Sequence, residues 1–157
     1  MQQVRKQLLR FLNIWPPFLG AGIKVLRISP DKREVDVEMR LRFWNKNYVG
    51  THFGGSLYAM VDPFFMLIVM ENLGPEFIVW DKAATIRFKR PGRGTVRAEF
   101  RVSQERIEAL RDELASKAKI EPVFQVEIKD QQGMVVAEIE KLLYIRRKDS
   151  LPSARTS

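Results

Sequence analysis

The chain has 157 residues, of which 45% are hydrophobic, and it contains no cysteine and one histidine. This length and apolar content suit one domain with a substantial core. The lack of cysteine excludes disulfides, thiolate zinc sites and cysteine nucleophiles, and a single histidine disfavours a histidine-built metal centre, so no metal site is predicted. The net charge of +8 favours an anionic partner, which can be nucleic acid, phospholipid or a phosphorylated cofactor.

The N-terminal residues 1–14 are predicted to form a helix that packs on the domain. Val4, Leu8 and Phe11 share one helical face, but no continuous apolar stretch typical of a signal peptide is present. We therefore expect a cytoplasmic protein. No acidic residue precedes Asp31, so a transit peptide and a membrane-surface helix stay open as alternatives.

Six strands are predicted, and neighbours along the chain are expected to pair as three antiparallel hairpins. The clearest, "REVDVEMRLRF", alternates apolar and charged residues, as a half-buried strand does. Pro91 to Gly94 is predicted to be the turn of the second hairpin. Ser103 can cap a surface helix that carries Ile107 and Leu110 on one stripe. The predicted strands span residues 22–29, 33–43, 77–89, 94–103, 123–130 and 134–147.

Residues 56–73 form a segment that is apolar on nearly every side of a helical period, so this helix must be surrounded. Its uninterrupted apolar run, residues 64–70, is shorter than the roughly 20 residues of a membrane span, which predicts a core helix. We predict an α+β domain over residues 1–148, in which a curled antiparallel sheet of five to six strands wraps one central helix, and a flexible tail over residues 149–157. Half of the helix would stay uncovered, which predicts at least a homodimer formed by edge-to-edge pairing of two sheets.

The segment "NYVGTHFGGSLYAMVDP", residues 47–63, together with "DKAATIRFKRPGRGTV", resembles the hotdog-fold superfamily. It is similar to a subgroup of acyl-CoA thioesterases that carry G-T-x-F-G-G-S-L-Y, and the likeness covers about residues 15–147. The resemblance implies an acyl-CoA or acyl-carrier thioesterase that works as a dimer or a dimer of dimers. Coenzyme A would be part of the substrate, and no separate cofactor is expected. Hotdog domains also serve as dehydratases and acyl sensors, so those functions stay open.

Thioester hydrolysis needs a donor for the carbonyl oxygen and a base or nucleophile near the carbonyl carbon. Gly54 and Gly55 allow backbone N–H groups to approach a ligand at a helix start, although they can equally serve a tight turn or close packing. Asp62 follows Gly55 by almost two helical turns, about 10 Å, so one carbonyl group spans the gap poorly. Antiparallel helices in a dimer would bring the two ends together. The resemblance to phenylacetate-pathway thioesterases, which have an acidic residue at the position of Asp62, implies that it is general base or nucleophile.

The sequence Asp62-Pro63 also permits a structural interpretation, in which Asp62 caps a new helix and Pro63 is its first residue. In the other interpretation the helix has already begun at Ser56. Pro63 then removes a backbone hydrogen bond and forces a kink that costs about 3 kcal/mol. We favour the kink, because a broken local rule beside a buried acid is typical of a functional site.

Three further polar residues near the glycines are candidates for the site. His52 can orient the substrate carbonyl, but a lone loop histidine is more often a hydrogen-bonded structural residue. Asn47 can present its carboxamide to the thioester or a water, and Asn45 competes for that role. Ser56 is interpreted as a helix-start residue that contacts substrate, because "GGSLY" does not fit the nucleophile elbow G-x-S-x-G.

The basic residues around the Pro-Gly turn are predicted to bind the phosphates of coenzyme A, although a solvated charged hairpin is the alternative. These residues are Arg87, Lys89, Arg90 and Arg93. The acyl group is expected in an apolar tunnel, or else its lining is plain core. The candidates for that lining are Tyr58, Phe64, Phe65 and Met66.

Three other functions are weighed against hydrolysis. A hotdog acyl-CoA-binding protein without turnover would use the same pocket. A dehydratase usually needs a histidine and an acid that meet across the dimer, and the spacing from His52 to Asp62 is shorter than expected there. Nucleic-acid binding is suggested by the charge and by Phe88 among arginines, but no common recognition motif is present, so no nucleic-acid partner is expected.

Overall fold

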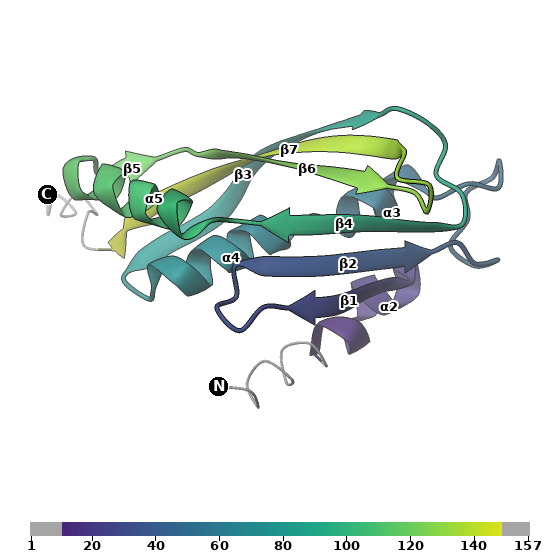
Figure 1. The fold of residues 1–157 in the computed structure, drawn as a ribbon, viewed down its shortest axis with the longest axis horizontal. Helices are drawn as coiled ribbons and strands as arrows, with labels where there is room; N and C mark the ends of the chain where they lie inside the picture. The colour runs from purple at the N-terminus through teal and green to yellow at the C-terminus, as the bar shows by residue number, and fades with distance from the viewer. Residues whose placement is uncertain (1–10, 149–157) are drawn as a thin grey trace, which may run out of the picture.

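The computed structural model describes residues 11–148, which form one antiparallel sheet and its covering helices (Figure 1). Most of the predicted N-terminal helix and the predicted tail lie outside this range, and residues 11–14 are helical. The elements in chain order are α2 (Pro16–Ala21), β1 (Ile23–Ile28), β2 (Glu34–Arg40), α3 (Gly54–Ala59), α4 (Phe64–Leu73), β3 (Phe77–Phe88), β4 (Thr95–Arg101), α5 (Gln104–Ser116), β5 (Lys119–Ile120), β6 (Val123–Lys129) and β7 (Val135–Arg147).

The sheet has seven strands, in the order β1-β2-β4-β6-β7-β3, and the short β5 pairs with one end of β7. All pairings are antiparallel. The hairpins β1–β2 and β6–β7 form as predicted. The seventh strand, β5, was not predicted, because two residues are too few to show an alternating pattern.

The predicted pairing of β3 with β4 is wrong. β3 pairs with β7 from Phe77 opposite Arg147 to Phe88 opposite Ala137, whereas β4 lies between β2 and β6. The connection after β3 contains Gly94 in the left-handed region at φ 65°, which is typical of a tight turn. Here that turn carries the chain from the sheet edge to its middle. The sequence shows the turn but not its direction.

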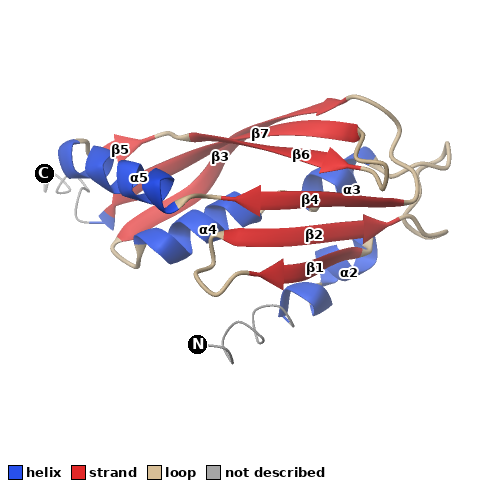
Figure 2. Ribbon diagram, in the orientation of Figure 1, coloured by secondary structure: helices blue, strands red, loops and turns tan. Residues whose placement is uncertain are grey.

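Figure 2 shows α3 and α4 on one side of the curved sheet, which wraps around them. Residues 60–63 form a turn that separates the two helices, and Pro63, which has no N–H, ends this turn. The segment Gly54–Leu73 is long and apolar enough to cross a membrane, with a mean hydropathy of 1.3. Its buried side chains, among them Leu57, Phe65 and Val69, belong to the hydrophobic core, as expected for the central helix of a wrapped sheet.

The core-facing residues alternate along β2, β4 and β6, so each of these strands buries one face against the central helix. Strands β4 and β6 pair only at Arg97–Lys129 and Ala98–Ile128. Beyond these pairs α5 covers the sheet with the predicted apolar stripe, which is buried at Ile107, Leu110 and Leu114. The predicted cap is also confirmed, since the hydroxyl of Ser103 accepts a hydrogen bond from the N–H of Arg106. The predicted α+β class and the wrapped central helix are therefore confirmed, and this is the hotdog arrangement.

The outer edge of β3 is open. Residues 82–85 of this strand, and Arg87 and Phe88, are exposed along it. β3 has β7 as its only neighbour among the strands of the described chain. An edge of this length presents a row of N–H and C=O groups that can pair with another strand.

Candidate active site

Asp62 lies in the turn between α3 and α4, with about half of its side chain exposed (48%). Its Oδ1 accepts a hydrogen bond from the hydroxyl of Tyr58 at 2.8 Å and one from Nζ of Lys141 at 2.9 Å. The first residue flanking α4 is Pro63, and no side chain caps that helix. The cap interpretation of Asp62 is therefore wrong, and its carboxylate faces Tyr58 and Lys141 instead.

Lys141, on β7, is fully buried, with 0% of its surface exposed. Besides Asp62, its ammonium group lies 3.0 Å from the hydroxyl oxygen of Tyr58 and 3.0 Å from Oδ1 of Asp81 on β3. Burial opposes the charge of Lys141, but hydrogen bonds to Tyr58, Asp62 and Asp81 raise its pKa above the ordinary value. Burial raises the pKa of Asp81, and Lys141 partly offsets this. Tyr58, Asp62, Asp81 and Lys141 form what we call the Lys141 cluster.

The sequence interpretation missed Lys141 and Asp81, although both leave a signal. Ile139, Lys141 and Leu143 alternate on the core-facing side of β7, so a lysine stands where an apolar residue is expected. Asp81 similarly follows Phe77 and Val79 on the core-facing side of β3. A charged residue that faces the core from a strand needs an ion-pair partner there, and two such residues of opposite charge can pair with each other.

The glycine pair begins α3 after Phe53, whose side chain offers no cap, so no side chain satisfies the first N–H groups of the helix. The glycines also allow close packing. A Cβ on Gly54 would lie 3.0 Å from the ring of Phe88, and one on Gly55 would lie 2.6 Å from the ring of Phe53. Both predicted uses of the glycines, donor and close packing, are compatible with this geometry.

His52 is 3% exposed and is anchored to the connection between β3 and β4. Its Nε2 lies 2.9 Å from the carbonyl oxygen of Gly94, and its backbone N–H donates to the carbonyl of Gly92 at 3.0 Å. Burial lowers the pKa of the ring, which favours the neutral form. This geometry favours a structural role, and a catalytic role for His52 stays a prediction.

Both candidate asparagines are engaged in local loop structure. Nδ2 of Asn47 donates to Oγ1 of Thr51 at 2.9 Å, while its Oδ1 accepts from the N–H groups of Val49 and Thr51 at 3.1 and 2.9 Å. The buried Asn45 donates to the carbonyls of Ala21 and Arg40 at 2.9 and 2.8 Å. Either carboxamide would have to give up such bonds to contact substrate. Ser56 lies in the first turn of α3, as predicted.

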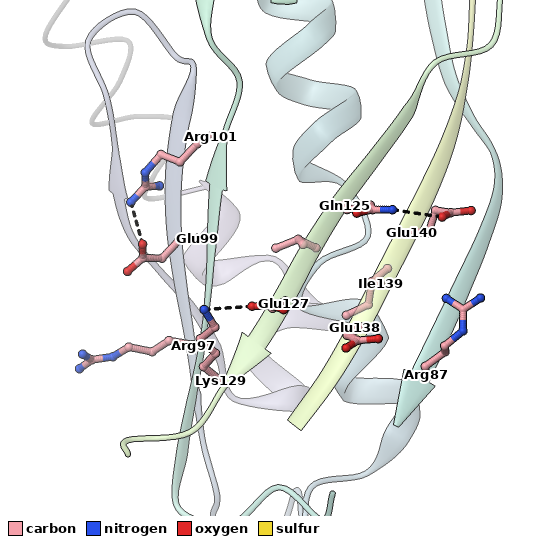
Figure 3. A pocket seen from close by; sticks show the side chains of 11 residues that line it. Arg87, Arg97, Glu99, Arg101, Gln125, Glu127, Lys129, Glu138, Ile139 and Glu140 are labelled. Carbon is pink, nitrogen blue, oxygen red and sulfur yellow. Dashed lines mark hydrogen bonds and ion pairs between the residues drawn. The ribbon is translucent and has the colours of Figure 1, made fainter. Parts of the chain in front are cut away.

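The predicted phosphate-binding residues separate into two groups. Lys89 makes an ion pair with Glu138 on β7 at 3.4 Å, and Arg87 borders a hollow of about 770 Å³ on the outer face of the sheet (Figure 3). Arg90 and Arg93 are exposed on the connection that His52 anchors, and no ion pair of the described residues involves them. The connection that carries this second pair is bonded to His52, two residues before Gly54.

The aromatic residues expected to line a tunnel are packed in the closed core of the protomer. Phe64 and Phe65 are 1% and 2% exposed, and their ring centroids lie 4.9 and 5.1 Å from that of Phe100. Met66 is partly buried against the same core. Tyr58 directs its hydroxyl to Asp62. An acyl tunnel along these residues stays a prediction.

Comparison with known proteins places this fold in a family. A family described as a domain of unknown function, DUF4442, matches residues 5–145. The chain belongs to the DUF4442 family. No curated protein matches the sequence.

Several solved structures share the fold of this DUF4442 protein. PA5026 from Pseudomonas aeruginosa, a protein of unknown function described as a probable thioesterase, is 26% identical with a TM-score of 0.81, over 90% of this chain and 95% of that one. Thioesterase HI1161 from Haemophilus influenzae is 14% identical with a TM-score of 0.67, over 96% and 94%. The PaaI protein of the E. coli phenylacetic acid degradation operon is 20% identical with a TM-score of 0.62, over 92% and 91%. The neighbours are thioesterase-like hotdog-fold proteins.

Proposed function

We propose that this DUF4442 protein hydrolyses acyl-CoA or acyl-carrier thioesters, with Asp62 as general base or nucleophile. The observation that carries the proposal is the half-exposed Asp62 at the break between α3 and α4, held through Oδ1 by Tyr58 and the buried Lys141. A base needs one side fixed and one side open to the reacting atom. The likeness to PA5026 supports a thioester as the substrate class.

The oxyanion donors in this proposal are the N–H groups at the start of α3, at Gly54 and Gly55, which no side chain caps. In this proposal the N–H groups of one protomer bind the carbonyl oxygen of a thioester whose carbonyl carbon lies beside Asp62 of the partner subunit. The open edge of β3 provides the route to such a dimer, because pairing two β3 strands continues the sheet and sets the central helices side by side. Each site is then shared between two subunits.

The phosphates of coenzyme A are assigned to Arg90 and Arg93. These two exposed cations lie on the connection whose carbonyls at Gly92 and Gly94 bond His52, two residues before Gly54. A phosphate bound there would lie at the entrance to the proposed oxyanion site. Coenzyme A enters as part of the substrate, and we retain the prediction of a cytoplasmic enzyme.

Two alternatives compete with hydrolysis. The dehydratase function needs a histidine free to transfer protons, and the ring of His52 is bonded to Gly94. An acyl-CoA-binding protein without turnover would use the same residues. The experiment below distinguishes binding without turnover from hydrolysis.

The first test is the Asp62→Asn variant, which keeps the shape of the side chain and removes its basicity. We expect hydrolysis of medium-chain, long-chain or aryl acyl-CoA, followed as free thiol, to fall at least about 10²-fold while binding is largely kept. Asp112→Asn is the matched control, because Asp112 is exposed on α5, outside the cluster. Full activity in Asp62→Asn would remove Asp62 from the mechanism. No thiol release by the wild type above a heat-killed control would leave the binding function.

A further inference from the structure

Resting on the proposed function of Asp62, we infer that Lys141 is a positioning residue: it fixes Oδ1 of Asp62 and offsets one of the two negative charges of the Asp62–Asp81 pair, leaving Oδ2 of Asp62 to take the proton of water. Lys141 itself does not touch substrate, because it is fully buried. It acts through Asp62, whose side chain is 48% exposed.

The first support is that three oxygens surround the ammonium group. It donates hydrogen bonds to Oδ1 of Asp62 at 2.9 Å and to the oxygen of Tyr58 at 3.0 Å, and it makes an ion pair with Oδ1 of Asp81 at 3.0 Å. Tyr58 receives one bond from Lys141 and donates its own proton to Asp62. The result is a closed ring of three hydrogen bonds that determines the direction of the carboxylate.

The second support is that both bonds from this ring reach the same oxygen of Asp62. The buried side of the carboxylate is thus held by Tyr58 from α3 and Lys141 from β7, while the exposed side is available. A general base needs such a fixed orientation, since a displacement of about 1 Å can cost about 10²-fold in rate.

The third support is that fold stability alone does not account for the cluster. A buried ion pair is often no more stabilising than well-packed apolar residues of the same volume. Asp81 alone would also suffice as a counter-ion for one buried lysine. The additional contact of Lys141 with the half-exposed Asp62 is explained if the carboxylate of Asp62 must be held in one orientation for catalysis.

The reaction step balances with Lys141 protonated throughout. Oδ2 of Asp62 accepts a proton as the water oxygen bonds to the thioester carbon, and the C–S bond then breaks. The proton passes from Asp62 to the departing thiolate, which gives the acid, the thiol and the original carboxylate. Lys141 keeps its three protons and donates none.

The test is the Lys141→Met variant, with Lys129→Met as matched control on the outer face of β6, where the side chain is about half exposed. We expect kcat to fall about 10-fold to 100-fold near pH 6 while KM changes little. The loss should shrink as the pH rises, because without the cation Asp81 takes up a proton at higher pH and that proton bonds to the base. The groups that face Asp62 are Tyr58 from α3, Asp81 from β3 and Lys141 from β7.

A loss confined to KM would overturn the inference, because Lys141 is assigned to the chemical step and not to substrate binding. A loss of kcat that is equal at every pH would overturn the charge-balancing part of the inference, because an effect of orientation alone does not depend on pH. Wild-type kinetics in Lys141→Met would overturn the inference as well. Lys141→Met leaves the carboxylate of Asp81 without its cation, which can unfold the single variant. The double variant Lys141→Met/Asp81→Asn removes that carboxylate as well. This double variant should fold and still show the reduced kcat.

A second measurement does not depend on activity. Carboxyl ¹³C NMR, with Asp81→Asn for assignment, reports the pH at which Asp81 takes up its proton. We expect that pH to be about 1 to 3 units higher in Lys141→Met than in wild type, because Lys141 lowers the pKa of Asp81. An unchanged titration would refute the inference even in an active enzyme. A shifted titration in a protein that hydrolyses no thioester would refute the proposed function and keep the role of Lys141.

Discussion

His52 is the only histidine in the chain, and it connects two segments that are distant in sequence. Its ring and backbone both bond the connection between β3 and β4, at Gly94 and Gly92. A Cβ on Gly92 would lie 3.3 Å from the imidazole ring, so a small residue is needed there. The conspicuous histidine therefore holds the basic connection against the start of α3.

The titration of His52 gives the first residue-scale prediction. Because burial lowers the pKa of the ring, its NMR signals should titrate with a midpoint below 6.5. The unfolded chain then binds more protons than the folded one below about pH 6.5. The free energy of unfolding should be fully retained above pH 6.5 and should fall as the pH drops toward the lowered value. Urea titrations at several pH values measure this.

His52→Gln is the comparison, because its amide can still donate to the carbonyl of Gly94 but cannot gain a proton. The slope of stability against pH between about 6.5 and 5.5 should be smaller in this variant than in wild type. Equal slopes would show that another group causes the dependence.

The candidate site residues that the sequence singles out carry a local signal. Asp62 stands out in sequence because an acid before proline in an apolar helix breaks a local rule. Lys141 and Asp81 lie 60 residues apart in sequence, on strands whose pairing no local pattern reveals. Their mutual contact follows from the register of β3 against β7, which the sequence does not reveal. The sequence alone shows only that both residues occupy inward-facing positions on their strands.

The break between α3 and α4 is the main feature at the scale of elements. The N–H of Asp62 still donates to the carbonyl of Tyr58 at 3.0 Å, as in a continuous helix. Pro63 has no N–H to offer the carbonyl of Ala59, so the ladder is interrupted beside Asp62. The carboxylate thus lies at the one point of the central helix where the backbone departs from regular geometry.

Replacing Pro63 by alanine should separate stability from activity. The restored hydrogen bond should make Pro63→Ala about 1 kcal/mol more stable than Pro75→Ala, which controls for the loss of a proline from the unfolded chain. Pro75 is exposed in the loop after α4. Turnover should fall at least about 10-fold, because a straighter helix moves Asp62 away from Lys141. Denaturant unfolding and thiol release measure the two effects. Unchanged turnover would show that the break does not orient Asp62.

The elements predicted from sequence agree with the structure where contacts are local. The central helix and the hairpins β1–β2 and β6–β7 follow from periodicity and turns. The pairing of β3 with β7 joins Phe77 to Arg147 across 70 residues, and the competing signal, the turn at Pro91 to Gly94, is a real bend that belongs to a crossing connection. Tertiary pairing overrode the local preference.

At the scale of the whole molecule, the open edge of β3 predicts the dimer. Neighbouring residues on a strand direct their N–H groups to opposite sides. Of Ala84 and Thr85, one therefore points its N–H to the open edge and the other points its N–H to β7. One of the variants Ala84→Pro and Thr85→Pro thus removes a donor from the open edge and leaves the hydrogen bonds between β3 and β7 intact. The variant that keeps the wild-type unfolding temperature should sediment as a monomer, whereas wild type should sediment as a dimer or larger. A proline at Leu26, exposed on the other edge strand β1, should leave the dimer intact. A dimer that survives both β3 variants would place the interface elsewhere.

The burial of Lys141 has a consequence for the alignment of the sheet. Side chains alternate across a strand, so a slip of β7 by one residue would turn Lys141 outward and bring Glu140 into the core without a cation. Such a misaligned sheet would contain an unpaired charge in the core on each of the two strands, because Asp81 would also lose its counter-ion. A buried lysine between two aspartates therefore selects one register of the longest strand pair in the molecule.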